Sequence, residues 1–348
     1  MNTGLGWARK TSARAAAIAS LSLLLIAACT QQAAPTLPAA MAGHSMQPID
    51  AAHAPKAAAD ARGNLPLVPS LDNGTKVYRL IPQLVRWDLQ PGVEVGAFTY
   101  NGTVPGPLLS LTPGDRVRVD VENRLSEPTS VHWHGLQIDN AQDGAAGITQ
   151  AAIQPGATYS YTFVVPNTPG TYFYHSHFQA DRQQPLGLYG PLVILDSRSA
   201  AVDVDRTIML GEWTLLKDGN IPAMDMPGME PNFFSLNGKS YPATETISAR
   251  VGQRVRLRII GSGQFIHPMH LHGQPFEITA TDGNPVPSGA RLVKDTVLVG
   301  PGERYDIEFV ARAPGKWLFH CHIAHHTTND GQEEQGAGGL TMIVEIAG

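Results

Sequence analysis

Short stretches in which apolar and polar residues alternate recur along the chain. Two clear examples are residues 117–121, Val-Arg-Val-Asp-Val, and residues 305–309, Tyr-Asp-Ile-Glu-Phe. Successive side chains of a β-strand point to opposite faces, so this period of two predicts strands with one buried and one wet face. Pro-Gly and Asn-Gly turns such as Asn101-Gly102 separate the stretches, and long amphipathic helices are hard to find. The pattern predicts an all-β chain built of sandwiches or barrels.

Composition agrees with this picture and narrows the partners. The 348 residues are enough for one large or two medium domains, and they include 35 glycines and 27 prolines. Charged residues make up only 16%, and the net charge is −5. No basic run is present, so nucleic acid is not an expected partner.

An internal repeat divides the body of the chain. Residues 155–177 resemble residues 301–322, residues 132–135 resemble 270–273, and residues 114–119 resemble 252–257. The three offsets lie between 138 and 146 positions and keep the same order, which indicates a duplicated domain. We therefore expect a first domain over residues 76–200 and a second over residues 201–348.

The N-terminus is typical of a targeting segment. Basic residues precede an apolar stretch over residues 15–28, and residues 25–29 (Leu-Ile-Ala-Ala-Cys) resemble a bacterial lipobox. The resemblance implies a signal peptide over residues 1–29 and a lipid on Cys29, which would anchor a periplasmic protein to the outer membrane. An ordinary secretory signal is the alternative. Residues 30–75 are rich in Ala and Pro, which is typical of a flexible tether.

Four His-x-His pairs stand out among the 13 histidines, and they occupy matching places in the repeat. Residues i and i+2 of a strand share one face, so each pair presents two imidazoles together. Eight imidazoles would then converge where the two domain copies face each other. Imidazole suits copper, zinc or iron. The pairs are His132 and His134, His175 and His177, His270 and His272, and His320 and His322.

Cys321 lies between the last two of these histidines, so on a strand it would face the other way. His267 likewise points opposite to His270, and the two side chains could meet on the far side of the same strands. His326 or its neighbour His325 could complete the set. Two histidines and one cysteine form the blue-copper arrangement. If Cys29 carries lipid, Cys321 has no disulfide partner, and a metal would occupy the thiol.

These motifs together resemble the multicopper oxidases, the laccase-like blue oxidases built of cupredoxin domains. The resemblance implies two tandem cupredoxin-like Greek-key β-sandwich domains and copper as the cofactor, with one type 1, one type 2 and two type 3 ions per chain. The implied ligands are His267, Cys321 and His326 for type 1; His132 and His270 for type 2; His134, His175 and His322 for one type 3 ion; and His177, His272 and His320 for the other.

The repeat predicts which domain holds the blue site. Applying the offsets to the type 1 ligands leads to Thr129, Ser176 and Asp181, which are not a copper-ligand set. The first domain should therefore lack a type 1 copper. Two-domain members of the family resemble rings of three chains, so a homotrimer is expected, with a monomer closing on itself as the alternative.

The resemblance also implies the reaction. Electrons from a small reducing substrate would enter at the type 1 copper and pass through Cys321 to His320 and His322, and O2 would be reduced to water. Asp143 is a candidate proton relay, or else part of a plain Asp-Gly turn. Gly331 stands at the usual axial spacing, so Leu340 or Met342 is expected to fill the axial space.

Two oxidase activities fit the sequence. A laccase would take electrons from phenols or aromatic amines, whereas a metal-ion oxidase would act on Cu(I), Mn(II) or Fe(II). The second hypothesis rests on Met224, Met226 and Met229, and on an acidic loop with Asp330, Glu333 and Glu334. A copper nitrite reductase and a non-catalytic copper protein are further alternatives, and the four paired histidine motifs argue against both.

Overall fold

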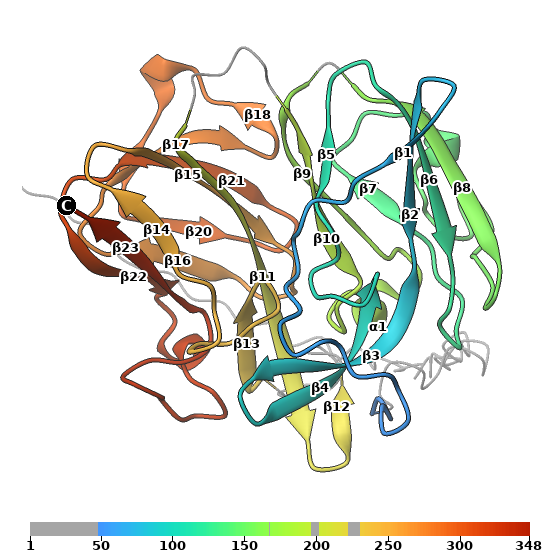
Figure 1. The fold of residues 1–348 in the computed structure, drawn as a ribbon, viewed down its shortest axis with the longest axis horizontal. Coiled ribbons are helices and arrows are strands. Elements are labelled where there is room, and N and C mark those ends of the chain that lie inside the picture. Colours follow the sequence, from blue (N-terminus) through green and yellow to red (C-terminus); the bar gives the residue numbers. More distant parts are fainter. Residues whose placement is uncertain (1–47, 167, 196–201, 222–229) are drawn as a thin grey trace, which may run out of the picture. The chain divides into compact units, whose positions relative to one another are not determined.

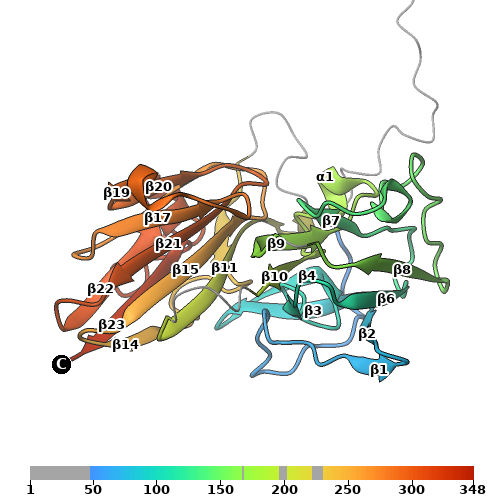
Figure 2. The same ribbon diagram turned by 90° about the horizontal axis from the view of Figure 1, so that it is seen from above.

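The computed structural model describes residues 48–166, 168–195, 202–221 and 230–348. Within these ranges the chain folds into two β-sandwiches (Figure 1), so the expected all-β class is confirmed. Figure 2 shows from above the second sandwich, in orange and red, beside the first, in blue and green. The signal peptide, the start of the tether and the three methionines at 224–229 lie outside the described residues. No helix in the described ranges is long and apolar enough to cross a bilayer.

The first sandwich has a sheet in the order β1-β2-β6-β8, a second sheet in the order β5-β10-β9-β7, and a separate β3-β4 hairpin. Its helices are short: α1 (Ala180–Gln183) and a 3-10 turn at Asn140–Gln142. The strands are β1 (Ser70–Asp72), β2 (Thr75–Leu80), β3 (Pro82–Gln90), β4 (Val93–Tyr100), β5 (Leu109–Leu111), β6 (Arg116–Glu122), β7 (His132–His134), β8 (Thr158–Val164), β9 (Gly170–His175) and β10 (Tyr189–Ile194).

The second sandwich packs an eight-stranded sheet, β12-β11-β15-β21-β17-β18 with β13 on β11 and β19 on β17, against the sheet β14-β23-β22-β16-β20. Two 3-10 turns, Ser288–Ala290 and Ala324–Thr327, interrupt its loops. The strands are β11 (Val204–Leu216), β12 (Gly219–Ile221), β13 (Phe233–Leu236), β14 (Ile247–Arg250), β15 (Arg254–Gly261), β16 (His267–Leu271), β17 (Phe276–Thr281), β18 (Asn284–Pro285), β19 (Val293–Lys294), β20 (Thr296–Val299), β21 (Arg304–Val310), β22 (Gly315–Cys321) and β23 (Thr341–Ala347).

The two sandwiches repeat the same strand pairing around their histidines. In the first, β7 pairs with β9 so that His132 lies opposite His175. In the second, β16 pairs with β22 so that His270 lies opposite His320. Equivalent residues of the repeat thus occupy equivalent positions in the two sheets, which is the structural expression of the duplication.

The alternating stretches 117–121 and 305–309 both form strands, but only the first has a partly solvent-exposed face. In β6 the valines are buried and the charged residues between them are partly exposed. In β21 both charged residues, Asp306 and Glu308, are also buried. They lie opposite Arg258 and Arg256 of β15, and Asp306 accepts a hydrogen bond from Thr171 of the first sandwich. Contact between the sandwiches therefore covers a face that alternation alone predicts to be wet.

Residues 48–69 depart from the expected flexible tether. Backbone amides of Ile49, Ala57 and Leu67 donate to carbonyls of Asn220, Arg86 and Leu108, at 2.8 to 2.9 Å. The composition of this segment gives no sign of these hydrogen bonds because the partners lie far away in the sequence.

A hydrophobic cluster shared by the two sandwiches, which includes Trp87, Phe173 and Trp213, lies between them.

Candidate functional site: histidine and cysteine clusters

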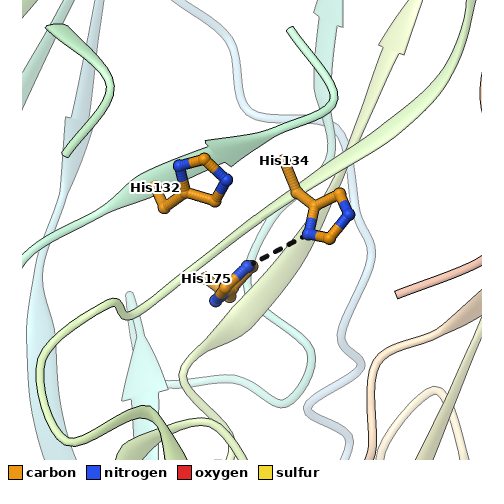
Figure 3. Close-up of side chains that lie close together, drawn as sticks. All are labelled: His132, His134 and His175. Atoms are coloured by element: carbon orange, nitrogen blue, oxygen red, sulfur yellow. Dashed lines mark hydrogen bonds between the residues drawn. The ribbon is translucent and has the colours of Figure 1, made fainter. Parts of the chain in front are cut away.

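The first sandwich holds four histidines together at the ends of β7 and β9. The rings of His132 and His175 lie 5.3 Å apart between centroids, and those of His132 and His177 lie 5.4 Å apart. Nδ1 of His134 lies 3.3 Å from Nε2 of His175 (Figure 3). One ligand atom from each of His132, His134 and His175 falls within 4.8 Å of the others, close enough to share a metal ion.

The second sandwich gathers a matching set from β16, β22 and the residues that follow them. Nε2 of His272 lies 2.9 Å from Nε2 of His320. The ring of His270 lies 5.7 Å from those of His320 and His322. In the described part of the chain, each group of three ligating side chains within 4.8 Å comes from one sandwich. Among the described residues, no such group combines histidines of both half-sets.

Hydrogen bonds from Nδ1 of these histidines to backbone carbonyls determine which ring nitrogen faces the site. Nδ1 of His175 lies 2.8 Å from the carbonyl of Ser176, and Nδ1 of His320 lies 2.8 Å from the carbonyl of Cys321. A ring that donates through Nδ1 keeps the lone pair of Nε2 free for a metal. Burial lowers the pKa of His134 and of His175 to about 3. Both rings are therefore neutral near pH 7, which is the form that binds metal.

The two histidines expected at a type 2 site share one more arrangement. Nδ1 of His132 lies 2.8 Å from the carbonyl of Asp143, whose carboxylate is 3.4 Å away. Nδ1 of His270 lies 2.9 Å from the carbonyl of Asp295. The internal repeat does not predict Asp295, because Asp295 is separated from His270 by more residues than Asp143 is from His132. Gly144, at φ +85°, packs so closely that a Cβ would lie 1.7 Å from the Val131 carbonyl oxygen, so the turn requires glycine.

His267, Cys321 and His326 converge on the other side of β16 and β22, and all three are buried. Nδ1 of His267 lies 3.1 Å from Nδ1 of His326, and the Cys321 sulfur lies 3.9 and 3.6 Å from these two nitrogens. Metal–nitrogen and metal–sulfur bonds of about 2.0 and 2.3 Å in a trigonal site would separate the nitrogens by about 3.5 Å and nitrogen from sulfur by about 3.7 Å. The donor set and its spacing therefore fit copper.

The neighbouring His325 lies apart from this cluster. Its Nε2 is 2.9 Å from the carbonyl of Pro231, whereas the His326 ring stacks on Phe234 with centroids 4.2 Å apart. Burial lowers the pKa of His326 to about 3 and raises the pKa of the Cys321 thiol to about 12. Without a metal, Cys321 is thus an inert buried thiol.

Strand register distinguishes the two candidates for the axial space. The backbone of Leu340 donates to the His326 carbonyl and accepts from the Cys321 amide, so Leu340 lies beside both residues. Met342 lies opposite Phe319, two residues before Cys321 on β22. Both side chains are buried. Gly331 lies in the preceding loop with φ +72°.

The equivalent position of the first sandwich contains a network of hydrogen bonds. Thr129 and Ser176 lie 3.3 Å apart between their hydroxyls, and both donate to Oε1 of the fully buried Gln183, at 2.8 and 2.6 Å. Asp181, the third counterpart from the repeat offset, is instead exposed in α1. The offset misses Gln183 because the chain forms a short helix here, where the second sandwich has a 3-10 turn.

Comparison with known proteins agrees with these arrangements. Residues 83–199 and residues 215–331 each match the profile of the multicopper oxidase family. The chain is 37% identical over 272 residues to the multicopper oxidase MmcO of Mycobacterium tuberculosis, covering 68% of this chain and 52% of that protein. It is 36% identical over 222 residues to laccase-3 of Thanatephorus cucumeris, covering 55% of this chain and 38% of that one. The chain thus spans about half the length, or less, of these curated relatives.

Solved structures match over a larger share of their length. A blue copper oxidase from Nitrosomonas europaea superposes with a TM-score of 0.71 at 33% identity, over 78% of this chain and 85% of that one. The multicopper oxidase mgLAC superposes with the same TM-score at 34% identity, over 78% and 86% of the two chains. Since a family profile matches in each sandwich and the fold agrees, the chain belongs to the multicopper oxidase family.

Proposed function

We propose that this protein is a laccase-like oxidase that couples one-electron oxidation of a phenol or aromatic amine to the reduction of O2 to water. The observation that carries this proposal is the buried set of His267, Cys321 and His326, which adjoins His320 and His322 within one strand end. Bound copper would supply the redox chemistry, taking electrons one at a time at a type 1 site and passing them to O2 at a trinuclear site. The family match and the laccase relatives support the same activity.

The chain itself contributes position and environment. Cys321 and the two histidines beside it would provide ligands for both the type 1 site and the trinuclear site from three consecutive residues. Leu340, beside Cys321, is an apolar neighbour with no ligating atom, which we expect to favour a three-coordinate copper of high potential. Asp143 is the candidate proton relay, because its carboxylate lies 3.4 Å from His132 and is one-third exposed.

We further propose that the trinuclear site forms between copies of the chain in a homotrimer. Support comes from the grouping of the ligating side chains: among the described residues, no group of three within 4.8 Å combines histidines of the two sandwiches. A closed ring in which the first sandwich of one copy faces the second sandwich of the next would complete every site.

The acidic loop does not favour the alternative of a metal-ion oxidase. Asp330 accepts a hydrogen bond from Asn232, and Glu334 accepts one from Gln90. These two carboxylates hold the loop against the rest of the chain. The methionines at 224, 226 and 229 fall outside the described residues and give no structural support.

Oxygen uptake tests the proposed function. The copper-loaded protein should consume O2 with a phenol, without accumulating peroxide, and should consume it at least as fast with the phenol as with Cu(I), Mn(II) or Fe(II). A variant with leucine at 224, 226 and 229 is the matched control and should keep its phenol activity. Uptake with metal ions alone, abolished in that variant, would contradict the laccase assignment in favour of a metal-ion oxidase.

The localisation remains a proposal from the sequence: a periplasmic protein anchored to the outer membrane through lipid on Cys29. Labelling with a fatty-acid analogue, compared between the native chain and Cys29→Ala, tests it. Equal labelling of both would contradict a lipid at this cysteine.

A further inference from the structure

A carboxylate that no sequence motif singles out lies against the candidate blue site. Glu212 belongs to β11, and its side chain is fully buried. Oε1 lies 2.5 Å from Nε2 of His267, and Oε2 accepts a hydrogen bond of 3.0 Å from the amide of Gln264. A buried carboxylate is tolerated only where it is hydrogen-bonded or paired, and here both oxygens have partners.

The backbone around this carboxylate is shaped to receive it. A Cβ on Gly263 would lie 1.8 Å from Oε2 and 2.1 Å from Oε1 of Glu212. Real Cβ atoms never approach so closely, so position 263 must remain glycine while the carboxylate keeps its place. The absence of a side chain at Gly263 thus leaves room for the carboxylate that contacts His267.

The contact decides which face of His267 is turned to the sulfur. With Nε2 donating to Glu212, Nδ1 is the nitrogen that lies 3.9 Å from the Cys321 sulfur and 3.1 Å from Nδ1 of His326. A carboxylate that accepts a hydrogen bond from the N–H of a ligand histidine fixes the tautomer and orientation of the ring. It also makes the other ring nitrogen a stronger metal ligand.

The second histidine of the cluster is held from the same pair of strands. Glu212 of β11 lies directly opposite Phe234 of β13. Phe234 stacks on the ring of His326, with centroids 4.2 Å apart and planes inclined by 24°. One cross-strand pair thus contacts both imidazoles, one by a charge-assisted hydrogen bond and the other by stacking.

We propose that Glu212 is a positioning residue of the blue site, which holds Nδ1 of His267 toward Cys321 and lowers the reduction potential of copper bound there. The inference rests on the proposed function, because it requires a type 1 copper. A negative charge in a dry interior stabilises Cu(II) more than Cu(I), since the ion of higher charge interacts more strongly with it. A purely structural carboxylate would leave the potential unchanged.

Two substitutions separate these roles in the full-length, copper-loaded protein. Glu212→Gln keeps the size of the side chain and removes its charge, so the preference for Cu(II) over Cu(I) should fall about tenfold or more. That change corresponds to a rise of about 59 mV per tenfold in the midpoint potential of the blue absorption band. Glu212→Ala also removes the hydrogen-bond acceptor of His267. The affinity of this variant for type 1 copper, measured by competition with a chelator, should be about 10–100-fold lower than that of the native protein.

Glu308→Gln is the matched control, because Glu308 is a buried carboxylate of the same sandwich that is paired with Arg256 instead of a histidine. Its potential should equal that of the native protein. In the metal-free protein, ¹⁵N NMR should show His267 protonated at Nε2 in the native chain and a mixture of tautomers in Glu212→Ala.

Each outcome bears on one claim. An unchanged potential in Glu212→Gln, with copper retention and the His267 tautomer unchanged in Glu212→Ala, would overturn the role of Glu212. If the alanine variant does not fold, the potential of the glutamine variant decides. A native protein that takes up no blue copper would refute the proposed function instead, and the tautomer measurement would still show whether Glu212 orients His267.

Discussion

Replacing Gln183 with leucine should weaken copper binding in the first sandwich and leave the blue site of the second intact. Gln183 accepts from the hydroxyls of Thr129 and Ser176, and its Nε2 donates to Glu127 and to the carbonyl of Pro128. Ser176 lies between His175 and His177, so this network fixes the strand end that presents both imidazoles.

The size of the effect follows from the partners that remain. The two hydroxyls, 3.3 Å apart, can bond to each other, and Ser176 also reaches the Phe178 carbonyl. The Pro128 carbonyl loses its partner, which costs about 1–3 kcal/mol, and the partly exposed Glu127 keeps Arg182 and loses less. We expect a loss of about 2–4 kcal/mol in the free energy of unfolding, or roughly 2–4 °C per kcal/mol in Tm.

The assay combines thermal unfolding with copper counted site by site, from the blue absorption band and from total metal. Gln183→Leu should retain its blue band while its remaining copper is removed by a chelator about 10–100-fold more readily. Asn220→Leu is the matched control, because Asn220 is a buried amide with two hydrogen bonds to Gly96. If both variants lose copper alike, or if the blue band disappears first in Gln183→Leu, the positioning argument is refuted.

Three other predictions follow from the site. Cys321→Ser should lose the blue band and oxidase activity by more than 100-fold while the other copper ions stay bound; retained turnover would contradict the route through this residue. Asp143→Asn should lose activity chiefly at higher pH, and an unchanged pH profile would leave Asp143 as a turn residue. Burial lowers the pKa of His175 and His326 to about 3, so the unfolded chain takes up protons first as the pH falls below about 6.5. The metal-free protein should thus lose about 2 kcal/mol of stability per histidine between pH 7 and pH 5, and equal unfolding temperatures at the two pH values would contradict this.

Local pattern was enough to predict the sandwiches and the grouping of the histidines, because both depend on a strand period of two. The alternation in residues 117–121 became β6, and the parity of His267 and Cys321 matches their meeting on one side of two neighbouring strands. The repeat supplied the rest, since duplicated strands keep their register.

Features that depend on contacts between distant segments were out of reach. Asp306 and Glu308 belong to an alternating stretch, yet the arginines of β15 and the neighbouring sandwich bury them. Glu212 lies 55 residues from His267 and belongs to no motif. Residues 48–69 have the composition of a tether but bond to strand edges whose sequences give no sign of it.

Native mass spectrometry of the copper-loaded protein, with copper counted per chain, tests the central claim most directly. We predict a trimer that carries one type 1 copper per chain and three further copper ions for each pair of facing half-sets. If contacts between sandwiches of neighbouring copies suffice for assembly, the metal-free protein should also be a trimer, lighter only by the mass of the copper. A monomer that binds the full copper complement and reduces O2 would contradict the claim that neighbouring copies complete each trinuclear site.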